Sequence, residues 1–212
     1  MPRRKLSDTE ELVLLEVIKC LRVLLNTAPG YPYVIETPTI VTHIAFALHG
    51  ASPKLRALSS DLLAAICVIS LNEGHRLVLG ALSDYKICFD EAFRFEELID
   101  ALRVEENAQS QEGEDDGSWE SRGATMGLII ALTSCSDSIE DRILLREEFS
   151  RRGLNEVMVV SAHLLHRLSC SNRNPNRDYD ISNHPMLCSS SSTPTPRINM
   201  KTKMTCGISC VV

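Results

Sequence analysis

The carboxyl end of the sequence contains two pairs of residues with the spacing of metal ligands. His184 and Cys188 are separated by three residues, and so are Cys206 and Cys210. Structural zinc is bound by paired Cys and His side chains a few residues apart, so these four residues could form a zinc site. A small zinc module also needs apolar residues packed near the metal, and residues 189–196 are all Ser, Thr or Pro. We therefore expect no metal site and no cofactor.

A second group that could do chemistry comprises His163, His166 and Cys170, which follow one another at helical spacing. These residue types could bind a metal or form a Cys/His pair, but a His near the end of a helix is also stabilised by the helix dipole. The second interpretation is favoured, because no Gly-rich phosphate loop, Ser/His/Asp order or metalloenzyme motif accompanies them. Cys210 is third from the end, whereas prenylation needs a Cys at the fourth position. An enzyme is therefore the least favoured class.

The composition argues against two further classes of function. Lys and Arg number 22 and Asp and Glu 28, and the resulting net charge of -6 is unlike the basic footprint of a nucleic-acid-binding domain. No run approaches the roughly 18 uncharged apolar residues of a membrane span, so we expect a cytoplasmic protein. Aromatic residues make up only 5%, which favours an aliphatic, helical core. Cys20, Cys67, Cys88 and Cys135 lie in apolar helical runs and are interpreted as reduced core thiols.

Helix signals begin close to the amino end. Ser7 and Glu10 form a capping-box pattern, and the helix that it starts is expected to run to Asn26. An asparagine at this place is a common helix terminator. The apolar residues recur at helical spacing, and the predicted core-facing stripe is Leu14, Val17, Ile18, Leu21, Leu24 and Leu25.

Two prolines mark the next helix starts. Thr37-Pro38 and Ser52-Pro53 each place a capping hydroxyl before a proline at the first helical position. The first of these helices is expected to run to about Leu48. Further helices are predicted at Glu73–Cys88, Phe93–Val104, Trp119–Cys135, Ser138–Arg152 and Leu154–Leu168.

A loose internal repeat connects these helices. Long apolar helical segments begin at Cys20, Leu62 and Gly127, so the steps are 42 and 65 residues. The second step becomes about 45 if some 20 residues around an acidic loop are an insertion, and a period of about 40–47 is typical of armadillo and HEAT arrays. After each long helix, a glycine precedes two apolar residues and is expected to open a short helix: Gly30/Val34/Ile35, Gly74/Val78/Leu79 and Gly153/Val157/Met158. We predict an all-α, armadillo/HEAT-like helical repeat, an α-solenoid.

Composition also sets the predicted domain limits. Residues 105–120 hold seven acidic residues and no basic one, which indicates a solvated loop within a helical domain of residues 7–168. Residues 169–212 are rich in Asn, Pro, Ser and Thr, and we expect a disordered tail there.

Four segments carry a resemblance to a known family. The segments are Val17–Asn26 with Gly30 after it, Leu62–Val68, Arg94–Asp100 and Leu144–Leu154. Their order and spacing resemble the amino-terminal regulatory region of diaphanous-related formins across roughly residues 10–168. The resemblance implies an armadillo-type GTPase-binding and FH3 region that binds a Rho-family GTPase and a formin's own autoinhibitory helix. It links the protein to Rho signalling and to actin only indirectly, at the cell cortex or cytoskeleton.

The resemblance also implies site residues. Asn26 occupies the place of an asparagine that contacts the GTPase in the family, and contact and capping are compatible. Ala65 and Val68 occupy the groove for the autoinhibitory helix, and Ile69 could extend its apolar stripe. Ile130 stands where the family usually has asparagine, so the groove is expected to be more apolar or less selective.

From the resemblance, we expect the family's upstream GTPase-binding segment, its proline-rich segment and its actin-nucleating domain to be missing from this chain. We therefore expect weak GTPase binding and no actin polymerisation by this chain. A generic armadillo or HEAT adaptor unrelated to actin is the alternative.

Overall fold

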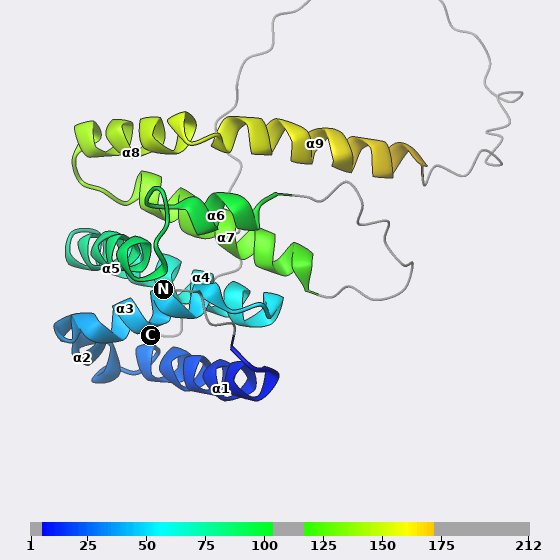
Figure 1. The fold of residues 1–212 in the computed structure, drawn as a ribbon. Coiled ribbons are helices and arrows are strands. Elements are labelled where there is room, and N and C mark those ends of the chain that lie inside the picture. The colour runs from blue at the N-terminus through cyan, green and yellow to red at the C-terminus, as the bar shows by residue number, and fades with distance from the viewer. Residues whose placement is uncertain (1–5, 104–116, 172–212) are drawn as a thin grey trace, which may run out of the picture. The chain divides into compact units, whose positions relative to one another are not determined.

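The structure is a computed structural model that describes residues 6–103 and 117–171, with side chains as far as His163. Within these residues the fold contains α-helices, one 3-10 helix and no strand, which confirms the predicted all-α class. The helices are α1 (Asp8–Leu25), α2 (Gly30–Glu36), α3 (Pro38–Phe46), η1 (Ala47–His49), α4 (Pro53–Ile69), α5 (Glu73–Phe89), α6 (Glu96–Ala101), α7 (Ser118–Ser134), α8 (Ile139–Arg151) and α9 (Leu154–Ser171). Figure 1 shows them stacked in chain order, from α1 and α2 to α8 and α9.

The start of α1 follows the predicted capping box. The Ser7 hydroxyl accepts a hydrogen bond from the Glu10 amide at 3.3 Å, and the Glu10 carboxylate accepts one from the Ser7 amide at 2.8 Å. These bonds satisfy backbone donors that have no partner within the helix. Asn26 is the carboxyl-terminal cap of the same helix, as predicted.

Helices α3 and α4 begin at the predicted prolines, but the predicted capping hydroxyls are wrong. Neither Thr37 nor Ser52 accepts a capping hydrogen bond through its side chain. At α4, a side chain from another helix binds the backbone amides instead. The Glu11 carboxylate of α1 accepts hydrogen bonds from the amides of Ala51 and Ser52, at 2.6 and 3.0 Å. A carboxylate near a helix amino terminus is favoured by the helix dipole, so α1 stabilises the start of α4.

Helices α1 and α4 run parallel. Glu11 near the start of α1 binds the segment just before α4. Further along, the charge of Arg22 acts on Asp61, which lies in the middle of α4. Both helices rise by the same distance per residue. Because positions 22 and 61 lie at about the same level, positions 26 and 65, four residues further along, also lie at about the same level.

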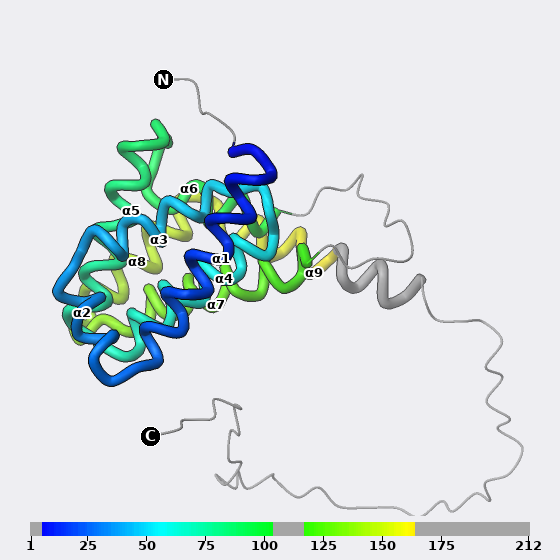
Figure 2. Tube along the Cα trace, turned by 90° about the horizontal axis from the view of Figure 1, so that it is seen from below, coloured from blue at the N-terminus to red at the C-terminus, as the bar shows by residue number. Residues whose placement is uncertain are grey.

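Helices α4 and α7 are also parallel neighbours. A Cβ at Gly117, just before α7, would lie 3.7 Å from the Lys54 side chain and 3.8 Å from that of Pro53, both at the start of α4. At the other end, Cys67 of α4 lies near Cys135, the carboxyl-terminal cap of α7. Figures 1 and 2 both show α1, α4 and α7 in succession, with α4 between the other two.

Helix α4 lies at the centre of the core, where it also packs against α3 and α5. One side of α4 is fully buried, and its largest buried side chains are Leu55, Leu63 and Ile66. The core is mainly aliphatic, as the low aromatic content predicted. Phe95 and Phe149 are an exception: their rings stack at 4.4 Å and join α6 to α8.

The three glycines of the predicted repeat do not share one role. A Cβ at Gly30 would meet the carbonyl oxygen of Leu24, and a Cβ at Gly74 would meet that of Ile66, so both glycines permit close contact with the preceding helix. Gly153 instead has φ +91°. The helices that follow also differ, because α2 is short but α5 and α9 have 17 and 18 residues. The prediction that each glycine opens a short helix is therefore correct only for α2.

Some predicted boundaries change. Helix α6 ends at Ala101, short of the predicted end. Helix α7 begins at Ser118, so residues 118–120 are helical and do not belong to the acidic loop. Helix α9 runs to Ser171, so the first three residues of the predicted tail are helical. The rest of the loop (to residue 116) and of the tail (from residue 172), together with the zinc-like pairs, lies outside the described residues.

The cysteines do not all belong to the core. Cys67 is buried and Cys135 is half-buried, but Cys20 and Cys88 are exposed. The prediction of core thiols is therefore wrong for these two, although all four are free thiols. Among the described residues, no helix is both long and apolar enough to cross a lipid bilayer.

Candidate functional site

Three predicted site residues share one side of α4. Val68 and Ile69 are 55% and 58% exposed, and Ala65 is half-buried. A spacing of three and four residues places them on the same side of the helix, one turn apart. Because the opposite side of α4 is in the core, the last two turns of the helix are apolar on both sides. An exposed apolar stripe of this kind is a candidate protein-binding surface.

Ile130 extends this stripe onto α7. Its side chain is 56% exposed. The parallel pairing of α4 and α7, with Pro53 against Gly117 and Cys67 near Cys135, places Ile130 at about the level of Ala65. Apolar side chains from two neighbouring helices therefore face the solvent at the same level.

Asn26 lies at the corresponding level on α1. Its backbone amide donates to the carbonyls of Arg22 and Val23, at 3.3 and 3.2 Å, and closes the helix. The residue is exposed, and its side-chain amide has no hydrogen bond within the described part of the chain. The structure thus brings the predicted residues to neighbouring helices; we call Asn26, Ala65, Val68, Ile69 and Ile130 the three-helix face.

Two charged residues lie one turn before the three-helix face, Arg22 on α1 and Asp61 on α4. Partial burial raises the pKa of the Asp61 carboxyl; the charge of Arg22 on α1 opposes this rise, and that of Glu120 on α7 adds to it. Sequence reasoning missed this pair, although Arg22 precedes Asn26 by four residues and Asp61 precedes Ala65 by four. A partner on this surface would meet apolar groups next to mixed charges.

Helix α1 also exposes apolar residues on another side. Leu12 and Val13 are more than 60% exposed and Val17 is 48% exposed. The prediction that Val17 faces the core is therefore wrong, whereas Ile18 and Leu25 are buried as predicted. The side chains of Leu12, Val13, Glu16, Val17, Cys20, Leu21 and Leu24 line an open apolar depression. Its position was missed because several α1 positions are apolar and periodicity does not show which of them a neighbouring helix covers.

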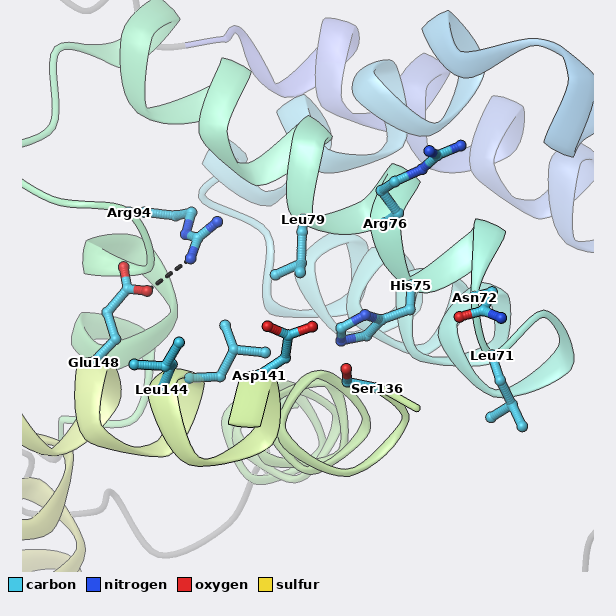
Figure 3. Close-up of a pocket in the computed structure, with 11 residues that line it drawn as sticks. Leu71, Asn72, His75, Arg76, Leu79, Arg94, Ser136, Asp141, Leu144 and Glu148 are labelled. Atoms are coloured by element: carbon cyan, nitrogen blue, oxygen red, sulfur yellow. Dashed lines mark hydrogen bonds and ion pairs between the residues drawn. The ribbon is translucent and has the colours of Figure 1, made fainter. Parts of the chain in front are cut away.

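A separate pocket of about 420 Å³ lies between α5 and α8, and we call it the α5–α8 pocket (Figure 3). Its α5 wall includes His75 and Leu79, and its α8 wall includes Asp141, Leu144 and Glu148. At one end, Arg94 donates to the Glu148 carboxylate at 2.7 Å and lies 4.6 Å from the centre of the Phe95 ring. No sequence motif indicated this pocket, because its residues come from segments that only the fold brings together.

His75 forms part of the inner wall of the α5–α8 pocket. The ring is 6% exposed, and its Nε2 lies 2.8 Å from the Leu132 carbonyl oxygen of α7. Because a carbonyl oxygen can only accept, Nε2 carries the hydrogen, and in the neutral ring Nδ1 is an acceptor. His163, which could have been a ligand, is instead an exposed residue of α9.

Comparison with known proteins identifies the family. The diaphanous GTPase-binding domain matches residues 3–68, and the diaphanous FH3 domain matches residues 75–169. On the structure, the first match contains α1 to α4 up to Val68, and the second begins in α5 and ends in α9. Both are non-catalytic regulatory domains, which agrees with the prediction that the chain is not an enzyme.

Individual relatives support the same assignment. The chain is 31% identical over 146 residues to formin-like protein 3 of Homo sapiens and 28% identical over 158 residues to formin-F of Dictyostelium discoideum. These alignments cover 69% and 74% of this chain but only 13% and 12% of the relatives. Inverted formin-2 of Xenopus laevis is 27% identical over 140 residues, which are 66% of this chain and 12% of that protein. The chain therefore belongs to the formin family: it carries the diaphanous GTPase-binding and FH3 domains and is homologous to the amino-terminal regions of formins.

Proposed function

We propose that this chain is a formin-type binding scaffold, whose three-helix face receives an amphipathic autoinhibitory helix of a formin. The observation that carries the proposal is the exposed apolar stripe formed by two neighbouring helices. Ala65 is small, so a partner helix can approach α4 closely there, while Val68, Ile69 and Ile130 offer apolar side chains around it. A helix laid against such a surface buries one apolar side and keeps its polar side in water.

The second part of the proposal is that a Rho-family GTPase contacts the chain at Asn26. The match to a GTPase-binding domain over residues 3–68 supports a GTPase partner. The Asn26 side chain is exposed, and its amide can both donate and accept hydrogen bonds. Because Asn26 lies at the level of Ala65 on the neighbouring helix, the two partners would meet at the same surface. Binding of the GTPase would then compete with the autoinhibitory helix, which links the scaffold to actin organisation indirectly.

A peptide titration tests the helix site. A labelled peptide of a formin autoinhibitory helix is titrated with the full chain and with Ala65→Asp, using fluorescence anisotropy. We expect the substitution to weaken binding by about tenfold or more, because the partner would cover an unpaired carboxylate. Ala162→Asp, at an exposed position of α9, is the matched control and should leave binding unchanged. Equal binding by the Ala65→Asp chain would refute the assignment of this face.

A pull-down with GTP-loaded and GDP-loaded Rho-family proteins tests the GTPase site. We expect weak binding that favours the GTP-loaded form and is reduced by Asn26→Ala. Asn155→Ala is the control, because Asn155 is an exposed asparagine whose side chain donates only to Ser150, at 2.7 Å. Binding that does not depend on the nucleotide, or that Asn26→Ala leaves intact, would contradict the proposal. Absence of binding to both partners would contradict both parts of the proposal.

A further inference from the structure

We propose that the α5–α8 pocket binds an arginine side chain presented by a segment of a partner protein. This inference goes beyond the proposed function, since the pocket uses α5 and α8 and no residue of the three-helix face. The proposal rests on which polar atoms in the pocket are available to a ligand. It also rests on the apolar side chains that surround those atoms.

Asp141 and His75 carry the acceptors on which the proposal rests, and the side chains of Asn72, Ser136 and Arg76, which carry donors, also line the pocket. The Asp141 carboxylate has no hydrogen bond or ion pair within the described part of the chain, and only the Asp141 backbone amide is engaged, by Ser138 at 3.3 Å. His75 is more than nine-tenths buried, and because Nε2 is held by Leu132, Nδ1 is its free acceptor. Figure 3 shows the Asp141 carboxylate directed toward the His75 ring. Two neighbouring acceptors, one of them charged, call for a cationic ligand with several N–H donors.

The cations that line the pocket do not compete for this role. Arg94 is bound to Glu148 and packs on the Phe95 ring. Figure 3 shows the guanidinium of Arg76 directed away from Asp141. A phosphate or carboxylate ligand beside Asp141 would therefore meet an unpaired carboxylate, and the guanidinium of Arg76 points away from that place, which argues against an anion there.

The apolar walls favour arginine as the source of the cation. Leu79 on α5 and Leu144 on α8 flank the acceptors, and Leu144 is 57% exposed, so an aliphatic stem would cover apolar surface there. The volume of about 420 Å³ lies within the range of small-ligand sites, about 300–1,000 Å³. A guanidinium presents five N–H donors in a planar fork, which suits two neighbouring acceptors, whereas an ammonium is a single strongly hydrated point charge.

Titration of the isotope-labelled full chain with the peptide acetyl-Leu-Arg-Leu-amide tests the proposal by NMR. We expect saturable shifts in the His75 ring and in the methyl groups of Leu79 and Leu144. The same peptide with citrulline has the shape of arginine without its charge. It should bind at least about tenfold more weakly, because the charge-assisted hydrogen bond to Asp141 is lost. A lysine peptide should also bind more weakly than the arginine peptide.

The matched variants are Asp141→Asn and Asp137→Asn. Asp137 is an exposed acidic residue just before α8 that does not line the pocket. Only Asp141→Asn should weaken arginine binding, by about tenfold. Equal binding of the citrulline or lysine peptide, full binding by Asp141→Asn, or shifts that map to other helices would each overturn the proposal. The citrulline comparison uses the unchanged protein, so it stands even if a variant folds poorly, and none of these outcomes depends on the three-helix face.

Discussion

Gly74 and Gly80 lie on the same helix but have different surroundings. A Cβ at position 74 would collide with the carbonyl of Ile66, whereas nothing lies within 4 Å of a Cβ at position 80. We expect Gly74→Ala to destabilise the protein by about 1–3 kcal/mol, because the backbone of α4 or α5 must shift. Gly80→Ala should stabilise it by about 0.5–1 kcal/mol, because alanine is the better helix former. Urea unfolding measures the free energy of unfolding of both variants. Equal effects would show that the close contact at Gly74 does not affect stability.

The cysteines differ at the residue scale in their reactivity. Burial raises the pKa of the Cys67 thiol to about 12, with a further contribution from the neighbouring Cys135. The thiolate is the reactive form, so at pH 8 Cys67 should resist alkylation. Cys20 and Cys88 are exposed and should react with iodoacetamide in the folded protein. Peptide mapping by mass spectrometry, with and without denaturant, checks this; rapid labelling of Cys67 in the folded chain would contradict its burial.

At the scale of elements, one carboxylate joins α1 to the start of α4. Glu11→Ala removes both hydrogen bonds to the amides of Ala51 and Ser52. We expect a loss of about 1 kcal/mol of unfolding free energy, since these bonds are charge-assisted but partly solvated. Ser52→Ala should have a smaller effect, because the Ser52 hydroxyl forms no capping hydrogen bond. Thermal unfolding compares the two variants, with Glu36→Ala at an exposed position of α2 as the control. A larger loss of stability for Ser52→Ala than for Glu11→Ala would show that the Ser52 hydroxyl, and not Glu11, stabilises the start of α4.

At the scale of the whole molecule, each helix packs mainly on its neighbours in the array. In such an array, a defect at one end should weaken the nearest layers most. Phe149→Ala removes a buried ring that stacks on Phe95, at a cost of about 3–5 kcal/mol. We expect hydrogen exchange to accelerate most in α6, α8 and α9 and least in α1 and α2.

A core substitution in α4 should act differently. Leu63 is fully buried in the helix that packs against α1, α3, α5 and α7. Leu63→Ala, at a cost of about 2–5 kcal/mol, should therefore raise exchange throughout the described helices. Hydrogen-exchange mass spectrometry of both variants tests this contrast. The same pattern of exchange in both would mean that the array unfolds as a single unit.

The sequence alone predicted most of the helices, whereas the residues of the three-helix face came mainly from the family resemblance and stay a prediction. Capping at Ser7, the prolines at 38 and 53 and helical spacing are properties of short segments, so they can be recognised without knowing the fold. The relation among Ala65, Val68 and Ile69 also follows from one helix. The family resemblance indicated Asn26, Ala65, Val68 and Ile130, and the matches to two diaphanous domains confirm the family.

Only the tertiary structure decided which apolar residues are covered and which distant segments meet. Val17 has the same periodicity as Ile18 and Leu25, yet it is exposed, because burial depends on where the neighbouring helices lie. Glu11 stabilises the start of α4 through contacts some 40 residues along the chain. The α5–α8 pocket likewise combines positions 71–79, 94 and 136–148. Local patterns in a sequence determine helices, but contacts between helices depend on packing geometry, which no short segment contains.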